Sequence, residues 1–232
     1  MCNYYSRHRP ASELQATFGF VDPIPNLEPR YVVRPTDTER VVAIGKDGAR
    51  HFPAMRWGLV PAWAEDIKTG LTLFNVRAET LRNKRAFAAP FDKRRRCVVP
   101  VDGFFEFTGE RGAKQPWYFK PRDGRLMAFA GIWESWTGPR DAPLAEPLIS
   151  FSVATTAPNA TVVPIHARMP VLLTEDADWD AWLDPASAPD RLVKMLAPAD
   201  DDLLEVFPVT RDLLKIKMPD ASVLEPVSVA AT

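Results

Sequence analysis

Cys2 is the residue of this chain whose position gives it unusual chemistry. If Met1 is removed, Cys2 becomes the N-terminal residue and carries an amine and a thiol on adjacent carbons. Free α-amino groups titrate near a pKa of about 8 and thiols near about 8.5, so both nucleophiles are partly available at neutral pH. The amine can form a Schiff base with an aldehyde, and the thiol can then close on the imine carbon to give a thiazolidine. The alternative is a terminus in which cysteine has no function.

Glu106 and His166 are the candidates for proton transfer. Glu106 stands in the segment 103–107, where every neighbour is apolar or glycine, and in a strand it shares a face with Phe104. A carboxyl group in an apolar pocket has a raised pKa, which would let Glu106 donate and accept protons near neutral pH; a solvent-facing strand glutamate is the alternative. His166 lies between two prolines in a predicted loop, either as a catalyst or as a structural hydrogen-bonding group.

Two further segments could hold a ligand. Asn75 either caps a following helix or orients a reacting amine, and Arg77 beside it suits a phosphate because its guanidinium is always charged and fork-shaped. Trp57 and Trp63 stand in a stretch bent by glycine and proline. Core packing is the default interpretation of a tryptophan, whereas exposed indoles could stack unpaired bases.

Charge is distributed unevenly although the formal net charge is only −1. Residues 82–96 hold seven basic side chains and one acid, while residues 175–205 hold ten acids and two basic side chains. These segments are either two solvated faces or a phosphate-binding face with an acidic back. A near-neutral total excludes a global electrostatic signature of nucleic-acid binding, so such a partner must be bound through the local basic segment.

Composition limits the classes of protein and cofactor that fit this chain. Its 232 residues are 46% hydrophobic and 25% charged, which is an ordinary globular balance. Two cysteines and three histidines without metal-ligand spacing predict no metal and no cofactor. No apolar run has the length of a signal peptide or a membrane span, which predicts a protein without a membrane partner that is located in the cytoplasm.

The 23 prolines disfavour long helices and favour short strands joined by turns. We expect an α+β, β-rich compact single domain over residues 1–232 with short flanking helices, its last ~10 residues forming a loose tail. Helices are expected over 77–89, after an N-cap at Thr174, and over 189–196. The expected strands are rich in β-branched and aromatic residues and cover 30–33, 41–44, 97–101, 104–108, 117–120, 126–133, 148–155 and 169–173.

Taken together, several segments resemble the SRAP (SOS response-associated peptidase) family, whose members shield abasic sites. The match runs in order through Cys2, 56–63, 74–80, 95–107, 126–133 and 155–170. The family fold, often described as a PUA-like pseudo-barrel, agrees with the strand-rich pattern. One departure is that Asn3 and Tyr4 follow Cys2 where the family commonly has Gly-Arg, which removes an arginine that could hold a phosphate.

The resemblance implies a role for each matching residue. Cys2 would be the covalent nucleophile, and Asn75 would position the N-terminus and the sugar. Glu106 would move protons during ring opening and imine formation, and His166 would hydrogen-bond or protonate the hydroxyl of the opened sugar. The DNA-binding residues are then expected to be Trp57, Trp63, Phe74, Arg77, Arg82, Lys84, Arg85, Thr155 and Arg168.

The function expected from these features is covalent capture of abasic sites in single-stranded DNA by a monomeric protein. The imine stage would also allow strand cleavage as an AP lyase, and removal of Met1 would be a self-processing step. Two alternatives stay open: a cysteine peptidase that uses Cys2 with His166, and a non-covalent single-stranded-DNA-binding module in which Cys2 has no function.

Overall fold

The computed structural model describes residues 3–110 and 112–228. Four α-helices and three short 3-10 helices accompany the strands in this part of the chain: α1 Ala11–Phe18, α2 Arg85–Asp92, α3 Asp176–Leu183, α4 Pro189–Lys194, η1 Ile67–Thr72, η2 Ala78–Thr80 and η3 Ala221–Leu224. The strands are β1 Tyr4–Arg7, β2 Arg30–Val33, β3 Thr38–Arg40, β4 Val42–Ile44, β5 Arg50–His51, β6 Ala54–Trp57, β7 Asn75–Arg77, β8 Arg96–Val101, β9 Gly103–Thr108, β10 Gln115–Pro121, β11 Met127–Trp136, β12 Leu148–Thr156, β13 Met169–Pro170, β14 Leu172–Leu173 and β15 Leu204–Pro208.

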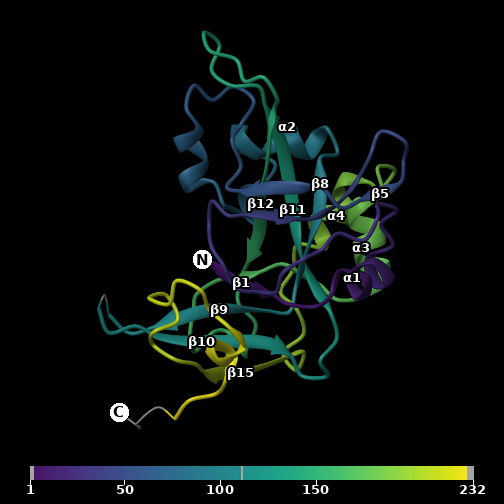
Figure 1. Cartoon of the computed structure of the whole chain (residues 1–232). Helices are drawn as coiled ribbons and strands as arrows, with labels where there is room; N and C mark the ends of the chain where they lie inside the picture. The colour runs from purple at the N-terminus through teal and green to yellow at the C-terminus, as the bar shows by residue number, and fades with distance from the viewer. Residues whose placement is uncertain (1–2, 111, 229–232) are drawn as a thin grey trace.

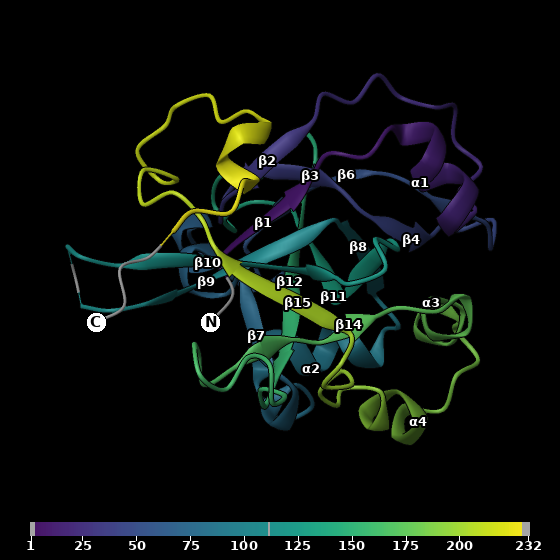
Figure 2. The same cartoon turned by 90° about the horizontal axis from the view of Figure 1, so that it is seen from below.

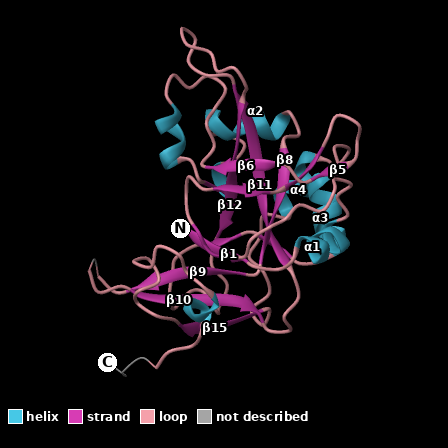
Figure 3. Ribbon diagram, in the orientation of Figure 1, coloured by secondary structure: helices cyan, strands magenta, loops and turns pink. Residues whose placement is uncertain are grey.

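These strands form two sheets that lie one above the other in Figure 1. The smaller has the order β15-β10-β9-β1-β2, with β15 and β2 on its opposite sides in Figure 2. The larger has the order β3-β6-β12-β11-β8-β4-β5, with β7, β13 and β14 paired to β12 and β11. Helices α1, α3 and α4 gather at one side of the larger sheet (Figure 3). The expected α+β, β-rich fold with short flanking helices is confirmed.

Most of the expected strands are present, because their apolar residues are buried on both faces. All six residues of β8 are buried, and its neighbour β11 is buried over Met127–Ile132. Strands that are buried in this way correspond to continuous apolar runs in the sequence. The run 169–173 is interrupted at Val171, whose neighbours pair with different strands, so it forms β13 and β14 instead of one strand.

The helix expected over 77–89 is wrong in its first half. Residues 75–77 are drawn into the larger sheet as β7, which runs parallel to β12 with Val153 opposite Asn75. Asn75 therefore does not cap a helix, and the α-helix begins only at Arg85. The cap expected at Thr174 is also displaced by one residue, because Glu175 and Asp178 form a capping box at the start of α3.

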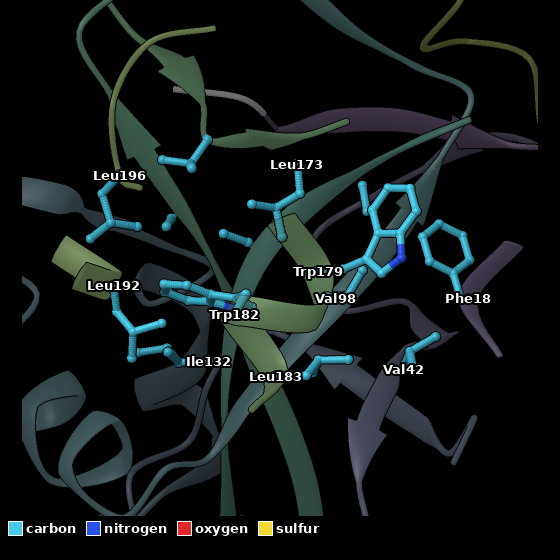
Figure 4. Packing of buried hydrophobic residues seen from close by; sticks show 14 of the residues in the cluster. Phe18, Val42, Val98, Ile132, Leu173, Trp179, Trp182, Leu183, Leu192 and Leu196 are labelled. Atoms are coloured by element: carbon cyan, nitrogen blue, oxygen red, sulfur yellow. The ribbon is translucent and has the colours of Figure 1, made fainter. Parts of the chain in front are cut away.

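The core of the larger sheet is closed by α3 and α4. Trp182 on α3 is fully buried, and its indole N–H lies 3.1 Å from the carbonyl oxygens of Cys97 and Gly131 on neighbouring strands. Figure 4 shows Trp182 among Ile132, Leu192 and other side chains of this cluster. A buried indole with a satisfied N–H fixes the helix against the sheet.

The first strand, β1, lies between β9 and β2 in the smaller sheet. It pairs antiparallel with β9, with Tyr4 opposite Phe105 and Tyr5 opposite Phe104. Continuing this register by one residue places Asn3 across from Glu106. The fold thus brings the N-terminal end of the described chain to the candidate proton-transfer residue.

The other end of the described chain packs against the smaller sheet. Val223 in η3 is 1% exposed and belongs to a cluster with Val32, and the Val227 N–H donates to the Pro208 carbonyl at 2.9 Å. Across the described residues, no helix combines the length and the apolar character needed to cross a bilayer.

Candidate active site

Glu106 is a buried carboxylic acid on β9, 3% exposed as a residue. It shares a face of β9 with Phe104, as the strand pattern predicts, and it lies opposite Trp117 on the neighbouring strand β10. Burial raises the pKa of Glu106 to about 7, and the positive charge of Lys114 opposes this shift. The group therefore exchanges its proton near neutral pH, where an ordinary glutamate would be fully ionised.

His166 lies next to Glu106 although it is far away in the sequence. Its Nδ1 is 3.5 Å from Glu106 Oε1, and Nδ1 also lies 3.1 Å from the backbone N–H of Arg168 and 2.9 Å from its carbonyl oxygen. Burial lowers the pKa of His166 below its ordinary value, so near neutral pH a proton held by the pair resides on Glu106. The two groups can act as an acid and a neutral hydrogen-bonding partner.

Asn75 and Arg77 belong to β7, at the C-terminal end of β12. Thr155 on β12 pairs with Arg77 on one edge and with Pro170 of β13 on the other. The β7 residues and the loop that carries His166 therefore flank the same strand end. Asn75 is buried at 8% exposed, whereas Arg77 is exposed.

Cys2, expected to be the nucleophile, lies outside the described residues. Its chain neighbour Asn3 is described, and the β1 register brings Asn3 to Glu106. Among the described residues no group of three or more histidines, cysteines, aspartates and glutamates could hold a metal ion. Cys97, the described cysteine, is fully buried in β8, and burial raises the pKa of its thiol well above the ordinary value. A buried thiol of this kind is inert as a nucleophile.

Comparison with known proteins identifies the family. The family model for the SOS response associated peptidase (SRAP) matches residues 1–216. The chain belongs to the SRAP family. Abasic site processing protein YoaM of Bacillus subtilis is 34% identical over 230 residues, which cover 97% of this chain and 98% of that protein. Abasic site processing protein HMCES of Gallus gallus is 32% identical over 195 residues, which cover 75% of this chain and 56% of that protein.

A solved structure supports the SRAP fold. The crystal structure of a protein from Bacteroides thetaiotaomicron superposes on this chain with a TM-score of 0.86, covering 98% of this chain and all of that chain. The two sequences are 24% identical, so this likeness concerns the fold. The expectation of an SRAP fold is confirmed.

Several of the exposed candidates for DNA binding in this SRAP protein lie at or against the start of α2. Trp63 is 46% exposed, and the guanidinium of Arg85 lies 4.7 Å from the centroid of its ring. Arg82 and Lys84 are exposed on the segment that leads into α2. Phe74, just before β7, is half-buried and packs edge-on against Trp57. These residues offer positive charge beside an aromatic surface.

Two of the expected DNA contacts are excluded by burial. Trp57 is fully buried, and its indole N–H donates to the Phe74 carbonyl at 2.8 Å, so it supports Phe74 from within the core and cannot stack on a base. Thr155 is also fully buried, and its hydroxyl donates to the Val76 carbonyl at 3.2 Å. Neither side chain reaches a phosphate in this conformation.

Arg168 is engaged within the protein and is not an open phosphate site. Its guanidinium donates to both carboxylate oxygens of Glu79, at 2.6 and 3.0 Å, and to the Thr155 carbonyl at 2.5 Å. Sequence reasoning assigned no role to Glu79 or to Lys114. The sequence feature that could have pointed to Glu79 is its place between Arg77 and the basic segment 82–96.

Proposed function

We propose that this protein captures abasic sites in single-stranded DNA covalently, through a thiazolidine formed by Cys2 after removal of Met1. The observation that carries the proposal is the register of β1 on β9, because its continuation by one residue brings Asn3, the residue after Cys2, opposite Glu106, whose carboxyl group lies 3.5 Å from His166 Nδ1. The SRAP relatives named abasic site processing proteins support the same substrate.

The chemistry follows from the open form of an abasic deoxyribose, which is an aldehyde. Glu106 exchanges a proton with the ring oxygen as the sugar opens, and His166 hydrogen-bonds the released hydroxyl. The Cys2 amine then attacks the aldehyde carbon and water leaves, which gives an imine. The Cys2 sulfur adds to that carbon and its proton passes to the nitrogen, which closes the ring. A positioned amine reacts at a high effective concentration of aldehyde.

Two further activities follow from the same intermediates. Abstraction of a proton beside the imine would break the strand by β-elimination, so a slow AP-lyase reaction competes with ring closure. Since the thiazolidine traps the protein, multiple turnovers are not expected. Asn75 is proposed to orient the amine and the sugar, and the flanking strand is proposed to lie on Arg77, Phe74 and the Trp63–Arg85 surface.

The test is to mix the purified protein, with loss of Met1 verified by intact mass, with single-stranded DNA that carries one abasic site. We expect a heat-stable one-to-one adduct whose mass is the sum of the two components less one water. Cys2→Ala should form none, whereas the matched variant Cys97→Ala should react like the wild type, because Cys97 is buried in the core.

DNA with a tetrahydrofuran in place of the abasic site has no aldehyde and should give no adduct. Absence of any adduct from protein with a free Cys2 would contradict the proposal. Retained DNA binding would then favour a non-covalent single-stranded-DNA-binding module, and hydrolysis of peptides that depends on Cys2 would favour a cysteine peptidase.

The DNA-binding surface makes a separate prediction about affinity. Trp63→Ala should weaken binding of undamaged single-stranded DNA by roughly 1–3 kcal/mol, the contribution of one base stacked on an aromatic ring. Lys84→Ala should instead lower the slope of log affinity against log salt concentration by about 1, because one phosphate contact is lost. Fluorescence titrations at several salt concentrations distinguish the two effects; an unchanged affinity in both variants would place the DNA elsewhere.

A further inference from the structure

The ion pair between Arg168 and Glu79 joins the two segments that flank the end of β12. Arg168 belongs to the loop before β13, and Glu79 belongs to η2, directly after β7. Both guanidinium–carboxylate bonds are within hydrogen-bond distance, at 2.6 and 3.0 Å, and the Arg168 side chain is only 16% exposed. A two-bond arrangement fixes the orientation of both groups, which a single contact would not do.

Arg168 is also the residue that holds the His166 ring. Its backbone N–H and carbonyl oxygen lie 3.1 and 2.9 Å from His166 Nδ1. A second contact, from the guanidinium to the Thr155 carbonyl at 2.5 Å, ties the same residue to β12. The position of the imidazole relative to Glu106 therefore depends on where the Arg168 side chain is anchored.

We propose that Glu79 is a positioning residue, which holds Arg168 and through it keeps His166 against Glu106. The inference rests on the proposed function for its effect on the reaction, since the pair His166–Glu106 is the proton-transfer pair of that proposal. It assigns both Glu79 and Arg168 to the placement of His166.

The burial of Glu106 beside His166 explains why a small displacement of the His166 loop would change the proton transfer. His166 covers Glu106 at 3.5 Å, and the charged or titratable groups that act on Glu106 from the described chain are His166 and Lys114. If the loop moves away, water reaches the carboxyl group and its pKa falls from about 7 toward the ordinary value. The Glu79 side chain is 55% exposed, so its carboxylate is largely solvated and its removal should leave the fold intact.

The experiment compares Glu79→Ala with the matched control Asp190→Ala. Asp190 forms an exposed ion pair with Arg82 at 3.3 Å, so its removal also takes the carboxylate partner from one arginine without touching the His166 loop. At saturating abasic DNA, Glu79→Ala should form the adduct roughly tenfold more slowly, and Asp190→Ala at the wild-type rate. Glu79→Gln, which keeps one acceptor oxygen, should lie between Glu79→Ala and the wild type.

Two readouts separate positioning from a general loss of structure. In Glu79→Ala the limb of the pH–rate profile that reports the titration of Glu106 should move to lower pH, and the affinity for undamaged DNA should not fall. In the free protein, NMR titration should show the pKa of His166 rising toward its ordinary value, because the ring becomes more exposed.

A His166 titration identical to that of the wild type, or equal rates for Glu79→Ala and Asp190→Ala, would overturn the assignment of Glu79. Because the NMR measurement needs no DNA, it tests the placement of His166 even if the wild-type protein forms no adduct. The absence of a wild-type adduct would instead refute the proposed function.

Discussion

Glu106→Gln is expected to slow adduct formation with abasic single-stranded DNA by about a hundredfold or more, the usual contribution of a positioned general acid or base. The amide has nearly the shape of the carboxyl group but cannot exchange the proton that opening of the sugar requires. Affinity for DNA should be unchanged, because Glu106 is buried and the proposed phosphate contacts lie on the surface. Single-turnover gels at saturating protein measure the rate, and binding to undamaged DNA measures the affinity.

The pH dependence identifies Glu106 as the titrating group. Burial raises the pKa of Glu106 to about 7, so the wild-type rate of adduct formation should depend on pH around this value. This dependence should be absent from the pH–rate profile of Glu106→Gln. Glu205→Gln, on β15 of the same sheet, is the matched control and should keep the wild-type rate and profile. A wild-type limb near pH 7 that persists in Glu106→Gln would assign the titration to another group.

Stability measurements serve as the control for folding in the same variant. The folded carboxyl group keeps its proton up to about pH 7, whereas in the unfolded chain it releases that proton near the ordinary glutamate value of 4.5, so the folded state binds more protons between these values. Wild-type stability should therefore fall as pH rises from about 4.5 to about 7. Above pH 7 Glu106→Gln should be more stable than the wild type by roughly 3 kcal/mol, and near pH 4 the two should agree.

Trp57→Ala is expected to lower the free energy of unfolding by about 4 kcal/mol, the cost of removing a large aromatic side chain from a packed core. The Trp57 ring stacks on Phe151 with a centroid distance of 6.4 Å and lies 5.1 Å from Tyr5 on β1. Its N–H bond to the Phe74 carbonyl is lost as well, while that carbonyl keeps its hydrogen bond from the Val153 N–H. Urea denaturation followed by circular dichroism measures the change.

Trp63→Ala is the matched comparison for Trp57→Ala. Trp63 is 46% exposed, so its loss should change stability little while weakening DNA binding. Trp57→Phe keeps most of the packing and should lie between Trp57→Ala and the wild type. A stable Trp57→Ala protein with selectively impaired DNA binding would contradict the assignment of Trp57 to the core.

The amino-acid sequence by itself determined the type of fold and the chemistry that the chain can offer. Continuous apolar runs predicted β8 and β11, because strands buried on both faces need such runs. The alternation around Glu106 predicted its face of the strand, since successive side chains of a strand point to opposite sides. The order of the family-like segments predicted SRAP membership, which the match over residues 1–216 confirms.

Only the tertiary structure decided how these groups meet. Residues 75–77 have no strong strand pattern, and pairing with β12 makes them a strand, so the helix expected from 77 begins only at Arg85. Burial decided that Trp57 supports the core while Trp63 stays at the surface, although both occur in one short segment. The contact of His166 with Glu106, and the ion pair of Arg168 with Glu79, join segments far apart in the chain, and their distances depend on sheet register and loop packing that no local pattern encodes.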